Sequence, residues 1–319
     1  MRLRQRLLLA CGVLAVLVAS QAVPAHASEL LADRNVTLLS LGVNAKGEAL
    51  LTYKRADGRL RRVLAWGALD ASAPDPAVRQ QRFKVDYSGG WGKYRRTGYW
   101  KRFRNVCRPY TGPQLVHLVQ ACTAPDGTHW AVQSWQRLQP LLGFDPWLPR
   151  HTAWEVHLSH WSGDLPVLEV WRHWTYGGHA QGLFGRLTYK GAPVFGFASS
   201  RVGSPTDGQG RNVYIDTLNS AYGPGWKRES GILVHRPTGT FCHSFVAQMP
   251  FPGYPSQERR PAAPGERYRV TVMGPGVTPV VQWEGPGLTS ADRQQQSTMR
   301  SIFDQVMAGD AKCAPERSA

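Results

Sequence analysis

The sequence lacks the short motifs of several large enzyme classes and has no long apolar run after its first 27 residues. It contains no G-x-S-x-G, no H-E-x-x-H and no Walker sequence after residue 27. These absences argue against the common serine hydrolases, the zincins and the nucleotide hydrolases. No later apolar run approaches the ~20 residues needed to span a bilayer, so we expect no transmembrane segment there.

Acidic residues are also few, and lysine is scarce beside arginine. The first 27 residues hold three of the 38 basic residues and no acid, so 35 basic and 22 acidic residues remain in the other 292. A charge balance this far from zero indicates an anionic partner or a highly charged, soluble surface. Glycine and proline are plentiful, which favours turns over long helices.

The amino terminus has the pattern of an exported protein. Three arginines lie within the first six residues, an apolar run covers residues 7–19, and residues 25–27 read Ala-His-Ala. This order of basic, apolar and small residues is typical of a secretory signal peptide. We predict that residues 1–27 are a signal peptide and that the protein is secreted or associated with the cell surface. A membrane anchor and a lipoprotein cysteine at Cys11 are the alternatives.

Cysteine is rare, with four residues after the predicted signal peptide and no C-x-x-C pair. The missing pair argues against zinc, and an even number of exported cysteines predicts two disulfides. Three pairings are possible. We favour Cys107 with Cys122, which closes a short loop, and Cys242 with Cys313, which would connect the end of the chain to its body. We expect neither a metal nor another cofactor.

Short aromatic and β-branched runs, separated by turn residues, extend along most of the chain without alternating helical patterns. They predict an all-β fold, an antiparallel β-sandwich of jelly-roll type. We expect a β-meander over residues 28–70, packed on a main sandwich domain over residues 71–319. One apolar stripe at helical spacing predicts a carboxyl-terminal α-helix over residues 290–308, docked on a sheet. We expect a monomer.

Residues 153–174, AWEVHLSHWSGDLPVLEVWRHW, gather chemically capable side chains around a Ser-Gly-Asp break. We interpret this segment as a β-hairpin with a three-residue loop. Because side chains alternate along a strand, that register would place four candidate catalytic residues on one face. These residues are Glu155, His157, Glu169 and His173.

This face has three interpretations. Two carboxylates on adjacent strands could be the acid and base of a glycosidase, which lie about 5–9.5 Å apart. A His, Glu, His set could hold a divalent metal. The third interpretation is a solvated sheet face with a cross-strand His–Glu pair and no catalytic role.

Residues 79–108 contain ten basic residues and one acid, Asp86, with seven aromatic residues interleaved. Aromatic rings offer flat apolar platforms, and arginines offer paired donors to carboxylate or phosphate, so the mixture suits an anionic polymer. Single-stranded nucleic acid fits the same residue types, but export makes it a poor physiological ligand. A basic surface loop without a ligand is the alternative. The predicted ligand-binding residues are Trp91, Arg95, Arg96, Trp100, Lys101 and Arg102.

A glycine-rich segment over residues 205–229 contains Asp207, Asp216 and Asn219 without the spacing of a calcium loop. We interpret it as a long surface loop that borders a cleft. The runs WEVHLSHWSG and SAYGPGWKRES resemble secreted proteins of unassigned function from high-GC bacteria, and this resemblance implies no activity, ligand or catalytic residue. The residues themselves predict a secreted binding protein for anionic polysaccharide or cell-envelope polymer. An extracellular glycoside hydrolase or polysaccharide lyase is the alternative, and the sequence does not decide whether the protein is an enzyme.

Overall fold

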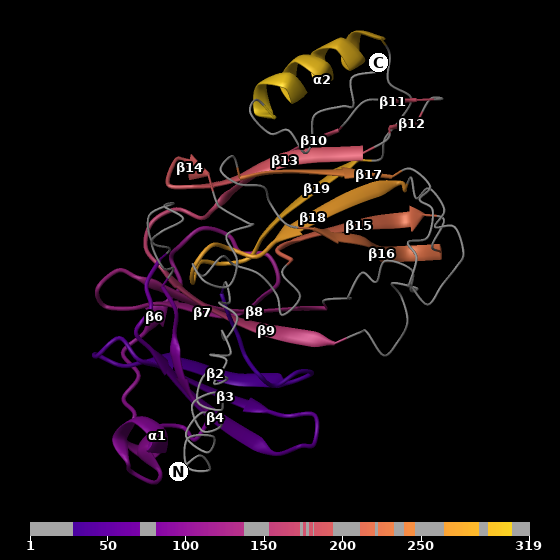
Figure 1. Ribbon diagram of the computed structural model, residues 1–319. Coiled ribbons are helices and arrows are strands. Elements are labelled where there is room, and N and C mark those ends of the chain that lie inside the picture. The colour runs from indigo at the N-terminus through magenta and orange to yellow at the C-terminus, as the bar shows by residue number, and fades with distance from the viewer. Residues whose placement is uncertain are drawn as a thin grey trace, which may run out of the picture.

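The all-β prediction is confirmed by a computed structural model in which antiparallel sheets dominate (Figure 1). The structure describes residues 28–70, 81–136, 153–172, 175–176, 179–180, 182–193, 211–220, 223–232, 239–245, 265–286 and 293–307. Its sheets stack as successive layers from the amino-terminal meander to the carboxyl-terminal helix. The architecture is sandwich-like, as expected.

Two sheets form the amino-terminal pair of layers. One sheet consists of β2 (Thr37–Val43), β3 (Ala49–Lys54), β4 (Leu60–Trp66) and β5 (Lys84–Asp86). The other has the strand order β1 (Glu29–Leu30), β9 (Trp154–Trp161), β8 (His129–Gln136), β7 (Leu118–Thr123) and β6 (Arg108–Pro109). Their facing apolar side chains share one core, which includes Leu51, Val63, Trp130 and Leu158. Burying both apolar faces against each other keeps the meander on the rest of the molecule.

A second pair of sheets lies toward the carboxyl terminus. One sheet contains β10 (Val167–Arg172), β13 (Gly182–Tyr189), β14 (Ala192–Pro193) and β17 (Thr240–Ser244). The other has the order β16 (Gly223–Ile232), β15 (Val213–Ser220), β18 (Arg267–Val272) and β19 (Val281–Pro286). Leu183 and Phe241 from the first sheet share a core with Ile215 and Val270 from the second. A small hairpin of β11 (Thr175–Tyr176) and β12 (His179–Ala180) adjoins this region.

The predicted carboxyl-terminal helix is present as α2 (Arg293–Val306). Phe303 and Met307 are buried against Phe184 of β13, and the rings of Phe184 and Phe303 meet edge to face with centroids 5.0 Å apart. The apolar stripe of α2 therefore covers one sheet, as its helical spacing predicted. No helix among the described residues is long and apolar enough to cross a membrane.

Strand β8 connects the two pairs of sheets because its alternate side chains enter different cores. Trp130 and Val132 belong to the amino-terminal core, whereas Trp135 packs with Tyr214 of β15. Gln133, fully buried, donates from Nε2 to the carbonyl oxygen of Val280 at 3.0 Å, and its Oε1 accepts from the Val280 amide at 2.9 Å. These contacts place the second half of β8 directly beside the sheet of β16, β15, β18 and β19.

The disulfide predicted between Cys107 and Cys122 is present, with its Cα atoms 5.7 Å apart. It joins the segment before β6 to β7, and Cys122 lies in the amino-terminal core. Cys242 on β17 is also in a disulfide. Its expected partner, Cys313, lies outside the described residues, so that pairing stays a prediction.

Candidate functional site

The hairpin predicted over residues 153–174 is wrong. Strand β9 pairs with β1 and β8, and β10 pairs with β13 of a different sheet. Seven of the eight residues of β9 are buried, as befits a strand with a neighbour on each side. Residues 162–166 instead carry the chain from one sheet to the next. The alternation of side chains along each strand predicts which residues share a face, but it does not indicate which strand pairs with which.

The four candidate catalytic residues are consequently divided. Glu155 is buried on β9, where its Oε1 lies 3.0 Å from Nη1 of Arg34 and its Oε2 lies 3.7 Å from Nε2 of His157. His157 also shares a 2.9 Å hydrogen bond through Nδ1 with the Ser28 hydroxyl. Glu169 lies on β10 and forms an ion pair with Arg186. His173 lies outside the described residues.

This division removes the predicted carboxylate pair, because Glu155 and Glu169 lie in different sheets with different arginine partners. Among the described residues, no group of three or more His, Cys, Asp or Glu side chains is placed to hold a metal ion. The structure therefore leaves Glu155 and His157 as a buried polar pair and gives them no second carboxylate from β10.

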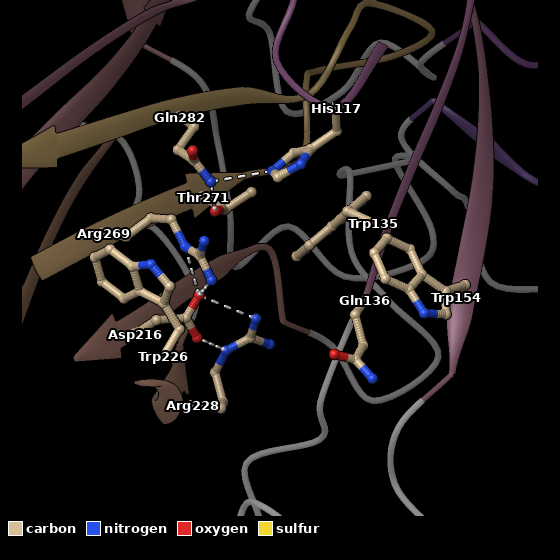
Figure 2. Close-up of a pocket in the computed structure, with 10 residues that line it drawn as sticks. All are labelled: His117, Trp135, Gln136, Trp154, Asp216, Trp226, Arg228, Arg269, Thr271 and Gln282. Carbon is tan, nitrogen blue, oxygen red and sulfur yellow. Dashed lines mark hydrogen bonds and ion pairs between the residues drawn. The ribbon is translucent and has the colours of Figure 1, made fainter. Parts of the chain in front are cut away.

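A cavity of about 240 Å³ lies where the end of β8 and the start of β9 meet the sheet of β16, β15, β18 and β19 (Figure 2). We call this sheet the β15–β19 sheet. Figure 2 shows Asp216, Trp226, Arg228 and Arg269 on one side of the cavity and Trp135, Gln136 and Trp154 on the other. The described residues that line it are His117, Trp135, Gln136, Trp154, Asp216, Trp226, Arg228, Arg269, Thr271 and Gln282. The cavity thus combines three indole rings with charged and amide groups.

One wall of the cavity is a buried carboxylate between two guanidinium groups. Asp216 on β15 pairs with Arg228 on β16, which is nearly inaccessible to solvent. Oδ2 of Asp216 also accepts from Nε and Nη2 of Arg269 at 3.0 and 2.9 Å. The Arg269 guanidinium lies 4.4 Å from the centroid of Trp226, a cation–π contact. Strand pairing positions all of these side chains on one sheet.

A neutral histidine lies on another side of the cavity. Nε2 of His117 accepts from the Gln282 amide at 3.1 Å, and the same amide nitrogen donates to the Thr271 hydroxyl at 2.8 Å. Burial, together with the positive charge of Arg269, lowers the pKa of His117 to about 4. The imidazole is therefore uncharged near neutral pH, and the positive charge of the cavity comes from its arginines.

The sequence predicted a long loop over residues 205–229, and the structure corrects this. Residues 213–220 and 223–232 form the hairpin of β15 and β16, and Asp216 is buried in it. The segment does border the cavity. Trp226, Arg228 and Arg269 were missed as site residues because lining positions range from 117 to 282 and share no local motif. The one signal in the sequence was an acid, Asp216, directly after the apolar run Val213–Ile215, where a strand could bury it.

All six predicted ligand-binding residues lie within residues 91–102, on two short helices and the turn between them. The helices are α1 (Trp91–Tyr94) and the 3₁₀ helix η1 (Tyr99–Arg102). Trp91 is 47% exposed, Trp100 is half-buried, and the four basic side chains are exposed. We call this set the basic aromatic surface: Trp91, Arg95, Arg96, Trp100, Lys101 and Arg102.

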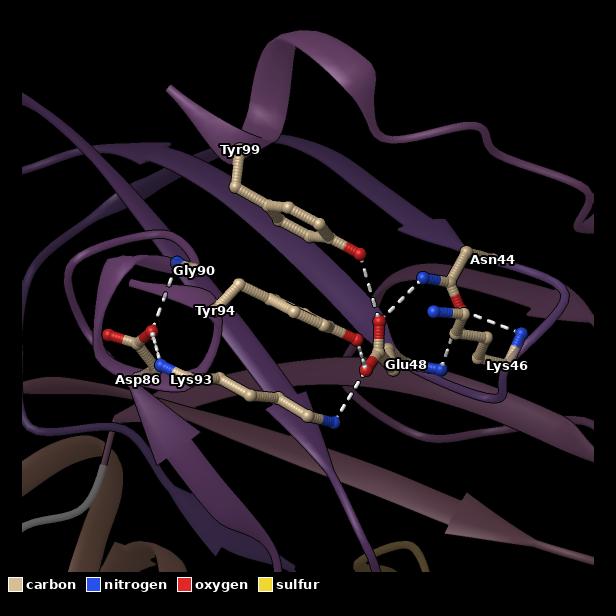
Figure 3. Close-up of polar contacts among 8 residues, drawn as sticks. All are labelled: Asn44, Lys46, Glu48, Asp86, Gly90, Lys93, Tyr94 and Tyr99. Atoms are coloured by element: carbon tan, nitrogen blue, oxygen red, sulfur yellow. Dashed lines mark hydrogen bonds and ion pairs between the residues drawn. The ribbon is translucent and has the colours of Figure 1, made fainter. Parts of the chain in front are cut away.

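A buried acid, Glu48 on the β2–β3 turn, holds the two helices together (Figure 3). Its carboxylate accepts from Lys93 Nζ at 2.5 Å, from the Tyr94 hydroxyl, and from the Tyr99 hydroxyl at 3.1 Å. Asn44 adds a fourth hydrogen bond at 2.7 Å. Burial alone would raise the pKa of Glu48, but the hydrogen bonds from Lys93, Tyr94 and Asn44 outweigh it and lower the pKa. Glu48 is thus a charged anchor for both helices.

Asp86, the single acid of the basic segment, fixes the turn that enters α1. Its carboxylate accepts from the backbone amides of Ser88 at 2.9 Å and of Gly90 and Lys93, both at 3.1 Å. Gly90 has φ 111°, and a Cβ there would lie 2.5 Å from the Tyr99 ring. The turn therefore needs glycine at this position. The Asp86 carboxylate is hydrogen-bonded to backbone amides of the same turn.

The exposed cations of the surface lie close to aromatic rings instead of carboxylates. The guanidinium of Arg95 lies 5.1 Å from the Trp91 centroid, and Nζ of Lys101 lies 5.6 Å from the Trp100 centroid. Among the ion pairs of the described residues, none involves the four basic residues of the basic aromatic surface. Their charge is therefore directed to solvent and not neutralised by a neighbouring acid in the described part of the chain.

Comparison with protein-family models found no match, and neither the curated proteins nor the solved structures gave a significant one.

Proposed function

We propose that this is a secreted binding protein for anionic polysaccharide or cell-envelope polymer, with the basic aromatic surface as its binding site. The observation that carries the proposal is the pairing pattern of this segment. The nearby acids, Glu48 and Asp86, form hydrogen bonds within the protein. The four basic residues of the basic aromatic surface remain exposed. Exposed cations beside an exposed indole suit a polymer of charged rings.

Preorganisation supports this proposal. Glu48 and Asp86 hold the backbone of the segment and the Tyr94 and Tyr99 rings, so a polymer would meet side chains that project from a fixed backbone. Binding to a fixed surface loses less conformational entropy than binding to a disordered basic tail. A purely solubilising surface would not need four hydrogen bonds to one buried carboxylate to hold its helices.

The alternative of a carbohydrate-active enzyme was based on two carboxylates on one sheet face, and the structure does not bring them together. A glycosidase needs two carboxyl groups about 5–9.5 Å apart on either side of one bond. Glu155 and Glu169 lie in separate sheets, and Asp216, the carboxylate of the cavity, is paired with two arginines. We therefore retain binding without catalysis as the proposal.

The test is retention on immobilised dextran sulfate across a salt gradient. Changing Arg95, Arg96, Lys101 and Arg102 to serine should weaken retention at least a hundredfold, because each cation at an anionic surface contributes about 1 kcal/mol. The matched control removes four exposed cations elsewhere, by changing Lys54, Arg59, Arg267 and Arg300 to serine. The control should elute close to the unchanged protein. Equal losses in both variants would show that net charge alone governs retention and would overturn the proposal.

A further inference from the structure

We infer that the cavity between β8, β9 and the β15–β19 sheet binds a single sugar acid, a pyranose ring that carries a carboxylate. This inference goes beyond the proposed polymer binding and uses none of the residues of the basic aromatic surface. It rests on the charge, the walls and the size of the cavity.

The charge of the lining favours an anion. Among the described lining residues, Asp216 is the single acid, and it faces both Arg228 and Arg269. Arg269 uses Nε and Nη2 for Asp216, and its side chain, which lines the cavity, is 23% exposed. Nη1 of Arg269 donates to no group in the described part of the chain, so it is available to a carboxylate ligand.

The aromatic walls favour a ligand with a flat apolar face. Trp154 is 50% exposed, and Figure 2 shows it opposite Trp226 and Arg269 across the cavity. An exposed indole beside a polar cavity is an apolar platform with one polar edge. A pyranose ring has C–H groups on its faces and hydroxyls around its edge, so it can bury the former on Trp154.

The polar groups around the cavity suit the hydroxyls of such a ring. Gln136, Thr271 and Gln282 come from three different strands, and His117 is a neutral imidazole near pH 7. Hydrogen-bonding groups distributed in this way match a ligand that has hydroxyls around its whole edge. An aromatic acid has only C–H groups around most of its edge, so it matches them less well. The volume of about 240 Å³ lies below the roughly 300–1,000 Å³ typical of drug-sized ligands, which limits the occupant to one ring.

The first test measures binding by tryptophan fluorescence and by calorimetry, since three indoles line the cavity. Glucuronate and galacturonate should bind, and glucose should bind at least about tenfold more weakly because it lacks the charge-assisted hydrogen bond. Benzoate and inorganic phosphate should also bind more weakly than the sugar acids. Benzoate or phosphate binding as tightly as the sugar acids, or no sugar acid binding at 10 mM (on the order of −3 kcal/mol), would overturn the inference.

The second test uses paired variants. Trp154→Ala should weaken glucuronate binding about fivefold, the scale of one aromatic contact, whereas Trp91→Ala, which removes an equally exposed indole outside the cavity, should not. Arg269→Gln should weaken binding about tenfold or more. If Arg269→Gln fails to fold, Arg269→Lys keeps a positive charge beside Asp216 but lacks Nη1, and it should also weaken glucuronate binding. Unchanged affinity in folded Trp154→Ala and arginine variants would overturn the inference.

The outcomes are separable from those of the proposed function. The serine variant of the basic aromatic surface should keep its affinity for glucuronate, and Trp154→Ala should keep its retention on dextran sulfate, which has no carboxylate. Loss of glucuronate binding in the serine variant would contradict a site in the cavity.

Discussion

At the scale of single residues, Glu48 shows how an acid can help to build a basic surface. Its side chain is 3% exposed and accepts hydrogen bonds from one lysine, one asparagine and two tyrosines. Tyr94 and Tyr99 stack with their ring centroids 4.4 Å apart, so the carboxylate holds both rings and both helices in one place. Removing this acid would therefore change the arrangement of α1 and η1 as well as the net charge of the protein.

The variant Glu48→Gln separates these two effects. It raises the net charge by one, but one amide nitrogen would face the donors of Lys93, Tyr94 or Tyr99, so we expect a loss of about 2 kcal/mol in the free energy of unfolding. Retention on dextran sulfate should fall despite the added charge. Asp304→Asn, which removes an exposed acid of α2, is the control and should raise retention slightly. Increased retention in Glu48→Gln would contradict a preformed surface.

At the scale of elements, the strands of the meander could be predicted because their signals are local. Alternating apolar residues and the turns at Asn44–Gly47 and Arg55–Gly58 are readable in sequence, and β2, β3 and β4 match the runs that they bound. The partner of β9 could not be predicted in this way. Its pairing with β8 joins residues separated by a long connection, and alternation within one run contains nothing about that choice.

The disulfide between Cys107 and Cys122 also belongs to this scale, because it connects the end of the basic segment to β7. It closes a loop with a separation of 15 residues, for which the chain-entropy model gives about 3 kcal/mol. The double variant Cys107→Ser/Cys122→Ser should therefore melt roughly 6–10 °C lower in calorimetry. Because Glu48 and Asp86 hold the basic aromatic surface independently, retention on dextran sulfate below the melting range should persist. An unchanged melting temperature, or retention lost at low temperature, would contradict this account.

At the scale of the whole molecule, the six ligand-binding residues and the cavity differ in how far the sequence could reveal them. The basic aromatic surface occupies twelve consecutive residues, so composition alone marked it. The cavity draws on residues from 117 to 282, which only the packing of two sheet pairs brings together. The same packing separated Glu155 from Glu169, since the chain changes sheets between β9 and β10.

The central claim is that polymer binds at the basic aromatic surface, and residue-resolved amide shifts test it most directly. A short sulfated oligosaccharide would be titrated into isotopically labelled protein in low salt. We predict that the largest shift changes fall on residues 91–102 and that they saturate together. Shift changes confined to other regions, with residues 91–102 unaffected, would contradict the claim.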